Sequence, residues 1–307
     1  MLPIRAIAQR VVERLASDGK RSDAAGRHPT LERRSAARPV FAEGWQKQLR
    51  AIASSPPLAP RKTTKIDVWV ASTDGIFRAK SCFDLLTESD WNSLQRIQDP
   101  GNRNSAIAAR ILLRLGLSKA TDRSIAPAEW RFVGAEGQRP TIANGLPRIR
   151  YSVSHVDELA VVAISPDLHV GIDVESVDQH ISNTAMAEFS HADELRSVQR
   201  LSGGQKTREF IRAWTLKEAY TKLRGVGHAL DFRMLSFTLD PSRLASAGTE
   251  NGAPTCFENF YVTVNHGLFH ASLAIEDPGP QSGDVEIRLI SLVDAARQFA
   301  CMSPSLM

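Results

Sequence analysis

Two acidic residues, Asp173 and Glu175, lie within the strand-like segment VGIDVES. Residues i and i+2 of a strand point to the same face, so the two carboxylates are expected side by side. Acids are poor strand formers, they are costly to bury, and neighbouring like charges repel. Either nearby Lys or Arg side chains neutralise them, or they bind a divalent cation such as Mg²⁺, which favours carboxylates together with phosphate oxygens.

A second candidate site lies in the sequence AWTLKEAYTK. On a helix, Trp214, Glu218 and Lys222 are spaced four residues apart and share roughly one face. The ordinary interpretation is a solvated Glu–Lys pair that stabilises the helix by about 0.3–0.5 kcal/mol. Apolar residues surround most of the helix circumference, however, which predicts a largely buried helix. A buried Glu218 needs a partner.

A third candidate is the histidine that ends the strand-like segment YSVSH. His155 follows Ser152 and Ser154, which stand at alternate positions. A single histidine is most often structural. At this position, a hydroxyl and an imidazole are both available to contact an anion.

Four segments, taken in order, resemble the 4′-phosphopantetheinyl transferases of the surfactin-synthetase-activating type: YSVSH, GIDVE, WTLKEAYTK and GVGHAL. A fifth segment, FSHADEL, matches a further part of that family. The resemblance extends from about Lys65 to about Leu292. It implies two pseudo-symmetric α+β lobes in one chain, with coenzyme A bound between them. The implied enzyme transfers phosphopantetheine from coenzyme A to a serine of an apo acyl or peptidyl carrier protein and releases adenosine 3′,5′-bisphosphate.

The resemblance also implies the roles of the acids and the lysine. Asp173, Glu175 and Glu218 match the residues that bind Mg²⁺, with Mn²⁺ as an alternative, and Lys222 matches a lysine near the coenzyme A phosphates. Charge that develops on the phosphate oxygens is then stabilised by the ion and by Lys222. The attacking serine needs a base, either a carboxylate or a metal-bound water. Glu218 is our candidate for this base. The predicted catalytic residues are therefore Asp173, Glu218 and Lys222.

The other implied contacts to coenzyme A lie in the first half of the chain. They are His155 at the 3′-phosphate, Ser154 as a further contact to coenzyme A, Arg139 and Pro140 near the adenosine, and Arg103 and Arg110 on the helix that supplies phosphate-binding side chains in the family. The chain departs from the family at two places. Val156 follows the histidine where Ser or Cys is frequent, and the GQRP loop is one residue longer, so that either Gln138 or Arg139 faces the ligand.

Two other functions fit part of the pattern. Metal-dependent nucleases also combine Asp, Glu and Lys, but they need Glu-x-Lys on the strand itself, and Ser176 and Val177 follow Glu175. The other alternative is an inactive homologue that binds carrier proteins, against which the intact acids and Lys222 argue. The sequence favours no pathway among fatty acid, polyketide, nonribosomal peptide and lysine biosynthesis, all of which use such carriers.

Hydrophobic periodicity predicts the elements that position these residues. Strands are expected in KIDVWVAST, EWRFVG, RYSVSH, LAVVAIS, VGIDVE, LSFTLD, YVTVNHGLFHASLAI and VEIRLISL, and helices in LTESDWNSLQRI, RNSAIAARILLRLGLS, AMAEFSHADELRSVQRL and KTREFIRAWTLKEAYTKLRG. Thr87 is the expected cap of the first helix, with Asp90 three positions on, and Gly116 lies near the end of the second. The elements form two rounds, which predicts a first lobe at 63–175 and a second at 176–300.

Charge is distributed unevenly along the chain. The net charge is +4, but residues 1–62 carry a net +8 and the remainder a net −4, which argues against a nucleic-acid interface on the body. Residues 1–62 are predicted to be a basic, flexible extension, with an amphipathic helix within 1–20 and a linker at 54–63. A transit peptide and an arm docked on the body are the alternatives.

The apolar segments and the cysteines indicate in which compartment the protein is expected. No stretch approaches about 20 apolar residues, so no membrane span is expected. Three widely spaced cysteines, Cys82, Cys256 and Cys301, predict neither a disulfide framework nor a zinc site, and therefore a reducing compartment. We expect a cytoplasmic protein, and the resemblance implies a monomer.

Overall fold

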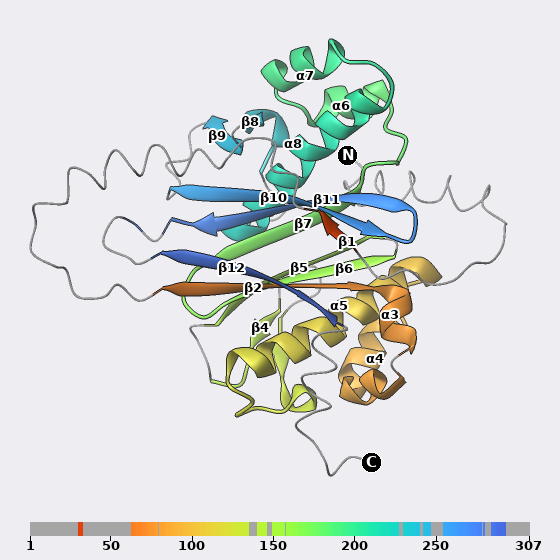
Figure 1. Ribbon diagram of the computed structural model, residues 1–307, viewed down its shortest axis with the longest axis vertical. Coiled ribbons are helices and arrows are strands. Elements are labelled where there is room, and N and C mark those ends of the chain that lie inside the picture. The colour runs from red at the N-terminus through yellow and green to blue at the C-terminus, as the bar shows by residue number, and fades with distance from the viewer. Residues whose placement is uncertain are drawn as a thin grey trace, which may run out of the picture.

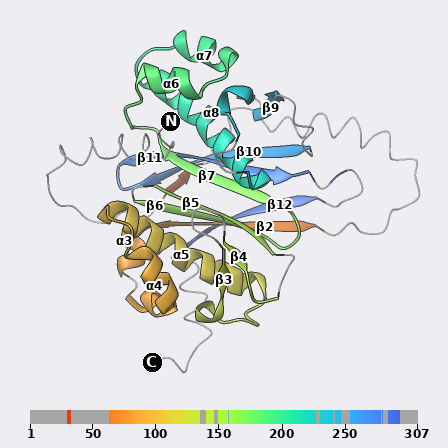
Figure 2. The ribbon, with the colours of Figure 1, turned by 180° about the vertical axis from the view of Figure 1, so that it is seen from behind.

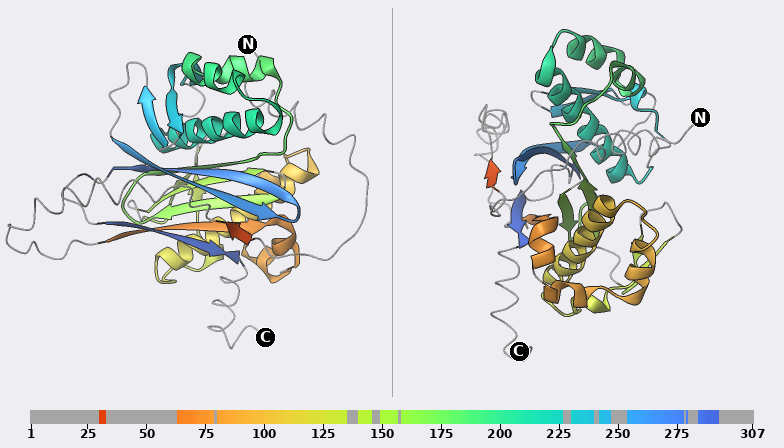
Figure 3. Two further views of the ribbon diagram at one scale, coloured as in Figure 1. Left: turned by 45° about the horizontal axis from the view of Figure 1, so that its top comes forward. Right: turned by 90° about the vertical axis from the view of Figure 1, so that its right-hand side faces the viewer.

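The structure is a computed structural model. It describes residues 30–32, 63–78, 80–134, 140–145, 149–156, 158–226, 230–239, 242–246, 254–277, 279 and 284–292. Helices and strands are mixed, as predicted, and they form four layers in the order helix, sheet, sheet, helix (Figures 1 and 3). Within the described residues, no helix is long and apolar enough to cross a membrane.

The first sheet has the strand order β12-β2-β6-β5. Its strands are β2 (Thr64–Ser72), β5 (Arg150–Val156), β6 (Leu159–Ser165) and β12 (Val285–Ser291). β12 pairs with β2 in parallel and the other pairs are antiparallel. The outer face packs against helices, which are α3 (Thr73–Arg78), α4 (Glu88–Leu94) and the long α5 (Pro100–Ala120) (Figure 2). The turns η1 (Lys80–Leu85) and η2 (Pro127–Glu129) and the hairpin of β3 (Phe132–Val133) and β4 (Thr141–Ile142) complete this side.

The second sheet has the order β1-β10-β11-β7, and all its pairs are antiparallel. Its strands are β1 (Thr30–Glu32), β7 (Val170–Ser176), β10 (Thr255–Val264) and β11 (Gly267–Glu276). The helix α8 (Gly203–Arg224) packs on its outer face. Around α8 lie α6 (Asn183–Phe189), α7 (Ala192–Gln199), η4 (Phe232–Met234), β8 (Ser236–Leu239) and β9 (Ser242–Ser246).

Aliphatic side chains from alternate strand positions fill the space between the two sheets. On β7, Ile172 and Val174 point into this core. Because successive residues of a strand point to opposite faces, Asp173 and Glu175 face α8. Each sheet therefore buries both faces, one against the other sheet and one against helices.

The predicted cap of α4 is confirmed. The amide of Asp90 donates to Thr87 Oγ1 at 3.3 Å, and the amide of Thr87 donates to Asp90 Oδ2 at 3.0 Å. Gly116 lies near the end of α5, as predicted, but it does not cap the helix, whose C-cap is Thr121. A Cβ at Gly116 would come within 2.3 Å of Ile164 Cδ1, so glycine here allows α5 to lie close to β6.

The single helix predicted for AMAEFSHADELRSVQRL is wrong, because two helices form there. Ser190 is extended, with φ −94° and ψ 143°, and ends α6. His191 begins α7 through a capping box, since its side chain accepts from the Asp193 amide at 3.2 Å and Glu194 accepts from the His191 amide at 3.0 Å. Capping residues inside the pattern thus override its continuous periodicity. The strand predicted in EWRFVG is also shorter than expected and reduces to β3.

The division into lobes at residue 175 stays a prediction. Strand β7, placed in the first lobe, lies in the sheet of β10 and β11, and β12, placed in the second, pairs with β2. Of the N-terminal extension, the structure describes β1, at the free edge of β10. The helix predicted within 1–20 lies outside the described residues, as does nearly all of the linker at 54–63.

Candidate active site

The candidate site lies where the edge strands of the two sheets, β5 and β7, come together. Two serine hydroxyls of β5 connect them. Ser152 Oγ accepts from the amide of Ile172 at 3.0 Å, and Ser154 Oγ donates to Asp173 Oδ1 at 2.8 Å. The site is therefore assembled from both sheets.

Asp173 is the centre of this site. It is 4% exposed, and its Oδ1 accepts from Lys222 Nζ at 2.6 Å as well as from Ser154. Lys222 Nζ also donates to Ser154 Oγ at 3.0 Å, so α8, β7 and β5 meet in one polar cluster. The second carboxylate oxygen, Oδ2, is buried and has no hydrogen-bond partner among the described residues.

Glu175 and Glu218 complete the acidic group that the sequence predicts. Burial raises the pKa of Glu175 to about 8, and the charge of Asp173 adds to the rise, although a hydrogen bond from Gln179 Nε2 at 3.2 Å opposes it. Burial also raises the pKa of Glu218 to about 7, again with a contribution from Asp173. The three acids thus lie close enough for their charges to interact. Among the described residues, however, no three His, Cys, Asp or Glu side chains converge as the ligands of one ion.

The raised pKa of Glu175 makes stability depend on pH. Its folded-state proton is held up to about pH 8, whereas the unfolded chain releases it near 4.5. Without divalent cations, wild-type stability should therefore fall as the pH rises through this range. Glu175→Gln is expected to raise Tm at pH 8 in EDTA by about 2 °C or more, and to leave Tm unchanged at pH 4. Glu188→Gln, at an exposed position of α6, is the control, and a lower Tm for Glu175→Gln at pH 8 would contradict the prediction.

The close approach of α8 to β7 depends on Gly171. A Cβ at this position would lie 2.0 Å from the carbonyl oxygen of Ala219 and 2.4 Å from the amide nitrogen of Leu223. Both are backbone atoms of α8, which cannot rotate away as a flexible side chain can. Only glycine lets the helix lie near enough for Lys222 to reach Asp173.

Gly171→Ala is expected to lower the free energy of unfolding by about 3 kcal/mol or more, because the added methyl group forces the helix from the strand. Urea denaturation measures the change. Gly204→Ala is the matched control, since an added Cβ in the first turn of α8 would meet no atom within 4 Å. Equal unfolding midpoints for the two variants would contradict the packing explanation.

His155 faces the opposite side of β5 from Ser154. Its ring Nδ1 lies 3.0 Å from Ser105 Oγ on α5, whereas Ser154 faces Asp173 and Lys222. The joint anion contact expected from His155 and Ser154 thus stays a prediction. Ser105 was not identified from the sequence, where its one signal is a polar residue among the alanines of the α5 segment.

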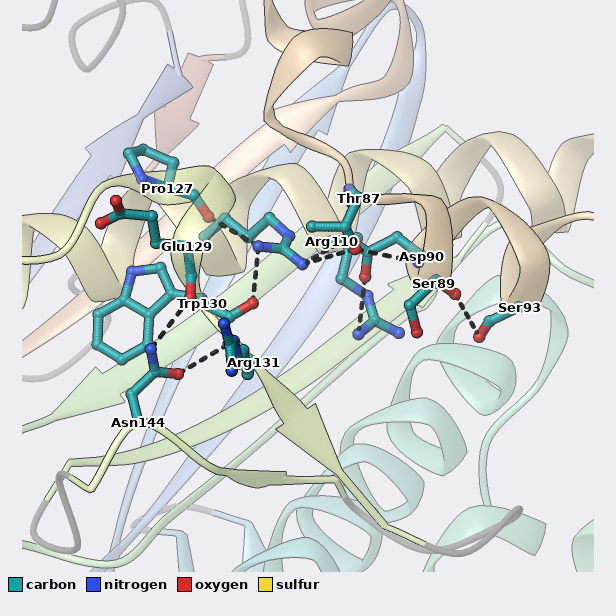
Figure 4. A network of polar contacts seen from close by, with 11 residues as sticks. Thr87, Ser89, Asp90, Ser93, Arg110, Pro127, Glu129, Trp130, Arg131 and Asn144 are labelled. Carbon is teal, nitrogen blue, oxygen red and sulfur yellow. Dashed lines mark hydrogen bonds and ion pairs between the residues drawn. The ribbon is translucent and has the colours of Figure 1, made fainter.

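The arginines predicted to bind phosphate contact protein groups in this structure. Arg103 donates from Nε to the carbonyl of Ile97 at 3.0 Å and from Nη2 to that of Gln98 at 3.3 Å. Arg110 lies 3.4 Å from Asp90 Oδ1 (Figure 4). Its guanidinium is also 5.5 Å from the ring centroid of Phe132.

Arg114, which was not identified from the sequence, joins Asp90 to Thr87, Pro127 and Trp130. It is 1% exposed and lies 2.5 Å from Asp90 Oδ2. It also donates to the carbonyls of Pro127 and Trp130 at 2.7 and 3.0 Å. Asp90 is therefore shared between a buried structural arginine and the more exposed Arg110.

The GQRP loop is described only at its last residue. Arg139 and Gln138 lie outside the described residues. The carbonyl of Pro140 accepts a hydrogen bond from the Tyr151 hydroxyl, which ties this end of the loop to β5. The assignment of Arg139 and Pro140 to the adenosine stays a prediction.

Comparison with known proteins places this site in a family. The model of the 4′-phosphopantetheinyl transferase superfamily matches residues 169–274, which contain all three acids and Lys222. A phosphopantetheinyl transferase of Thraustochytrium sp. is 29% identical over 50% of this chain and 58% of its own length. The L-aminoadipate-semialdehyde dehydrogenase-phosphopantetheinyl transferase of Eremothecium gossypii is 30% identical over 64% of this chain and 75% of its own. The chain belongs to the 4′-phosphopantetheinyl transferase superfamily.

A solved structure is also similar to part of this superfamily member. The holo-(acyl-carrier-protein) synthase of Thermotoga maritima matches 35% of this chain and 62% of its own chain, at 21% identity and a TM-score of 0.24. That overlap is too small to support a conclusion about the fold. Residues 103–155, with the predicted phosphate-binding arginines and His155, lie outside the segment that the superfamily model matches.

A buried ion pair joins α8, the helix that carries Glu218 and Lys222, to α7. Lys217 is 1% exposed, and its Nζ lies 2.5 Å from Glu194 Oε2 on α7. The same Nζ donates to the carbonyls of Phe189 and Phe232 at 3.0 and 2.9 Å. Glu194 also accepts from the amide of Phe237 at 2.9 Å. Because Lys217 adjoins Glu218 on α8, this network fixes the rotation of the helix that presents Glu218. It also gives a structural role to the FSHADEL segment.

Proposed function

We propose that this superfamily member transfers 4′-phosphopantetheine from coenzyme A to a serine of an apo acyl or peptidyl carrier protein, and that it is of the surfactin-synthetase-activating type. The observation that supports the proposal is the cluster of Asp173, Lys222 and Ser154, with Glu175 and Glu218 beside it, at the junction of the two sheets. Asp173 is buried and Glu175 and Glu218 are partly buried, and such a group of like charges next to a lysine is costly for stability and suits a polyanionic ligand.

The chemistry of the acids suits a divalent cation, for which we propose Mg²⁺, with Mn²⁺ as an alternative, although the three described carboxylates do not converge on one point in this structure. The buried Oδ2 of Asp173 lacks a hydrogen-bond partner among the described residues, and the pKa values of Glu175 and Glu218 are raised partly by the charge of Asp173. Hard carboxylate oxygens are the donors that such ions prefer. The bound ion would supply positive charge to the pyrophosphate of coenzyme A.

The reaction follows from the side chains around it. Glu218 accepts the proton of the carrier serine hydroxyl, and its pKa of about 7 suits a base at neutral pH. The serine oxygen forms a bond to the phosphorus of the phosphopantetheine, while the phosphorus–oxygen bond to adenosine 3′,5′-bisphosphate breaks. Lys222 stabilises the negative charge that develops on the phosphate oxygens and on the leaving group.

The proposal also includes the two lobes, the place where coenzyme A binds, the cellular location and the oligomeric state. Each sheet packs against one long helix, α5 or α8, which supports two pseudo-symmetric lobes, although β7 and β12 cross the expected boundary. Coenzyme A would bind between the lobes, near His155, Ser154, Arg139, Pro140, Arg103 and Arg110. We propose that the protein acts as a cytoplasmic monomer.

Incubation with coenzyme A, Mg²⁺ and an apo carrier protein tests the function. The expected result, read by intact mass, is a carrier heavier by one phosphopantetheine group and stoichiometric adenosine 3′,5′-bisphosphate. A carrier in which the acceptor serine is replaced by alanine is the control. Carrier binding without a mass change would point to an inactive homologue, and Mg²⁺-dependent cleavage of nucleic acid would point to a nuclease.

A further inference from the structure

The Ser154 hydroxyl is shared between the two charged groups at the centre of the candidate active site. It donates to Asp173 Oδ1 at 2.8 Å and accepts from Lys222 Nζ at 3.0 Å. Lys222 Nζ itself donates to the same Oδ1 at 2.6 Å. These directions are fixed by the groups, because a carboxylate accepts and an ammonium donates. The three side chains therefore form a closed triangle of hydrogen bonds.

This triangle leaves Ser154 no hydrogen for a phosphate group. A hydroxyl carries one hydrogen, and that of Ser154 is donated to Asp173. Ionised phosphate oxygens are acceptors, so they would meet only the lone pairs of Ser154 Oγ. The residue is also buried, at 8% exposed. The contact to coenzyme A that the family resemblance implies for this hydroxyl would therefore require its bond to Asp173 to break.

Ser154 belongs to a rigid part of the structure, whereas the Lys222 side chain is flexible. Ser154 lies on β5 and pairs there with Val161 of β6, a residue that is 0% exposed. Its side chain is short, but the ammonium of lysine ends a four-carbon stem. A contact to one carboxylate oxygen lets an ammonium swing about that oxygen. A second contact, made from the first sheet, restricts this motion.

We propose that Ser154 is a positioning residue, whose hydroxyl holds the ammonium of Lys222 against Asp173 and does not itself contact coenzyme A. A strand of the first sheet thereby determines where α8, which packs on the second sheet, presents its positive charge. Ser154 acts on the reaction only through the two charged groups that it joins.

The consequence for catalysis rests on the proposed function, in which Lys222 stabilises the charge that develops on the phosphate oxygens. Such stabilisation depends on the position of the donor, and a displacement of about 1 Å can lower a rate on the order of 100-fold. The general attraction between the ammonium and the phosphates of bound coenzyme A changes little over the same displacement. Loss of Ser154 should therefore affect kcat more than binding.

Ser154→Ala is expected to lower kcat by about 10–100-fold, as for the loss of one hydrogen bond to a charged group, and to change KM for coenzyme A by less than about 3-fold. Transfer to a fixed apo carrier protein measures both constants. Ser165→Ala is the matched control, because Ser165 is a fully buried serine of β6 whose hydroxyl accepts from the Leu168 amide at 3.0 Å. A raised KM with unchanged kcat would overturn the proposal and indicate a direct contact to coenzyme A.

A double-mutant cycle shows whether Ser154 acts through Lys222. Residues in one hydrogen-bond network have effects that do not add. In the Lys222→Met background, Ser154→Ala is therefore expected to lower the residual kcat by less than about 3-fold. An equal loss in both backgrounds would overturn the proposal, because it would show that Ser154 contributes independently of Lys222.

The mobility of the Lys222 ammonium can be measured on the whole protein without substrate. Its ¹⁵N–¹H signal, assigned through its loss in Lys222→Met, gives an order parameter from ¹⁵N relaxation. We expect a restricted ammonium in the wild type and in Ser165→Ala, and a mobile one in Ser154→Ala. Equal order in the wild type and Ser154→Ala overturns the proposal. A mobile wild-type ammonium also overturns it, even if Ser154→Ala does not fold. If the wild type transfers no phosphopantetheine, the proposed function fails, while this measurement still decides the role of Ser154.

Discussion

Asp173→Asn is expected to lower kcat for phosphopantetheine transfer by more than about 100-fold while the fold persists. The carboxylate of Asp173 joins Lys222 and Ser154 through Oδ1, and its buried Oδ2 remains for a cation. Asparagine has nearly the same shape, but it removes the charge and turns an amide N–H₂ donor toward groups that are already donors. Single-turnover assays with a fixed carrier protein and saturating coenzyme A measure the loss.

The same substitution should not destabilise the protein when divalent cations are absent. The charge of Asp173 contributes to the raised pKa values of Glu175 and Glu218, so its removal relieves repulsion. We expect a Tm in EDTA that equals or exceeds that of the wild type, with a smaller rise on addition of Mg²⁺. Asp122→Asn, in the exposed turn after α5, is the control for a change of charge. Near wild-type turnover by Asp173→Asn at low Mg²⁺ would refute the assignment of Asp173 to the metal.

Glu218→Gln is expected to lower kcat by about 10²–10⁴-fold, the usual contribution of a positioned base. The amide keeps the size of the side chain and one oxygen, but it cannot take a proton from the carrier serine at neutral pH. We therefore expect a smaller change in coenzyme A affinity than in kcat. Glu209→Gln, on the same helix and paired with Arg212 at 3.1 Å, is the matched control.

The pH–rate profile decides between base and ligand for Glu218. A base must be deprotonated to act, so the wild-type rate should fall as the pH drops below the pKa of Glu218. That pKa is about 7 in this structure, raised first by burial and then by Asp173, and a bound cation would lower it. The acidic limb should be missing from the residual activity of Glu218→Gln. The same limb at reduced amplitude would show that another group is the base.

The sequence predicted the parts of the site that depend on local periodicity. Alternation along β7 places Asp173 and Glu175 on one face, and the apolar surroundings of Glu218 correctly predict that α8 is largely buried. The spacing in WTLKEAYTK also predicts that Glu218 and Lys222 share one face of the helix, and in the structure Lys222 contacts Asp173. These features need no knowledge of how the sheets are arranged.

The features that the sequence did not predict depend on residues far apart in the chain. Ser105 and His155 are 50 residues apart, and Lys217 and Glu194 meet only once α7 has folded against α8. The family resemblance implies that Arg110 contacts phosphate, but in the structure Arg110 pairs with Asp90, which lies on a different helix. Side-chain pairing of this kind is set by tertiary packing, which local patterns do not encode.

The parallel pairing of β12 with β2 has a consequence for folding while the chain is being synthesised. Asp67 and Arg288, which form an ion pair across these strands, are 221 residues apart. At a synthesis rate of about 5–20 residues per second, β2 leaves the ribosome roughly ten seconds to a minute before its edge partner exists. During that time, β2 can form its antiparallel pair with β6 once β6 has emerged, but the outer edge of β2 stays open to other extended chains. We therefore expect nascent chains stalled before residue 284 to bind chaperones through β2, and release to follow emergence of β12.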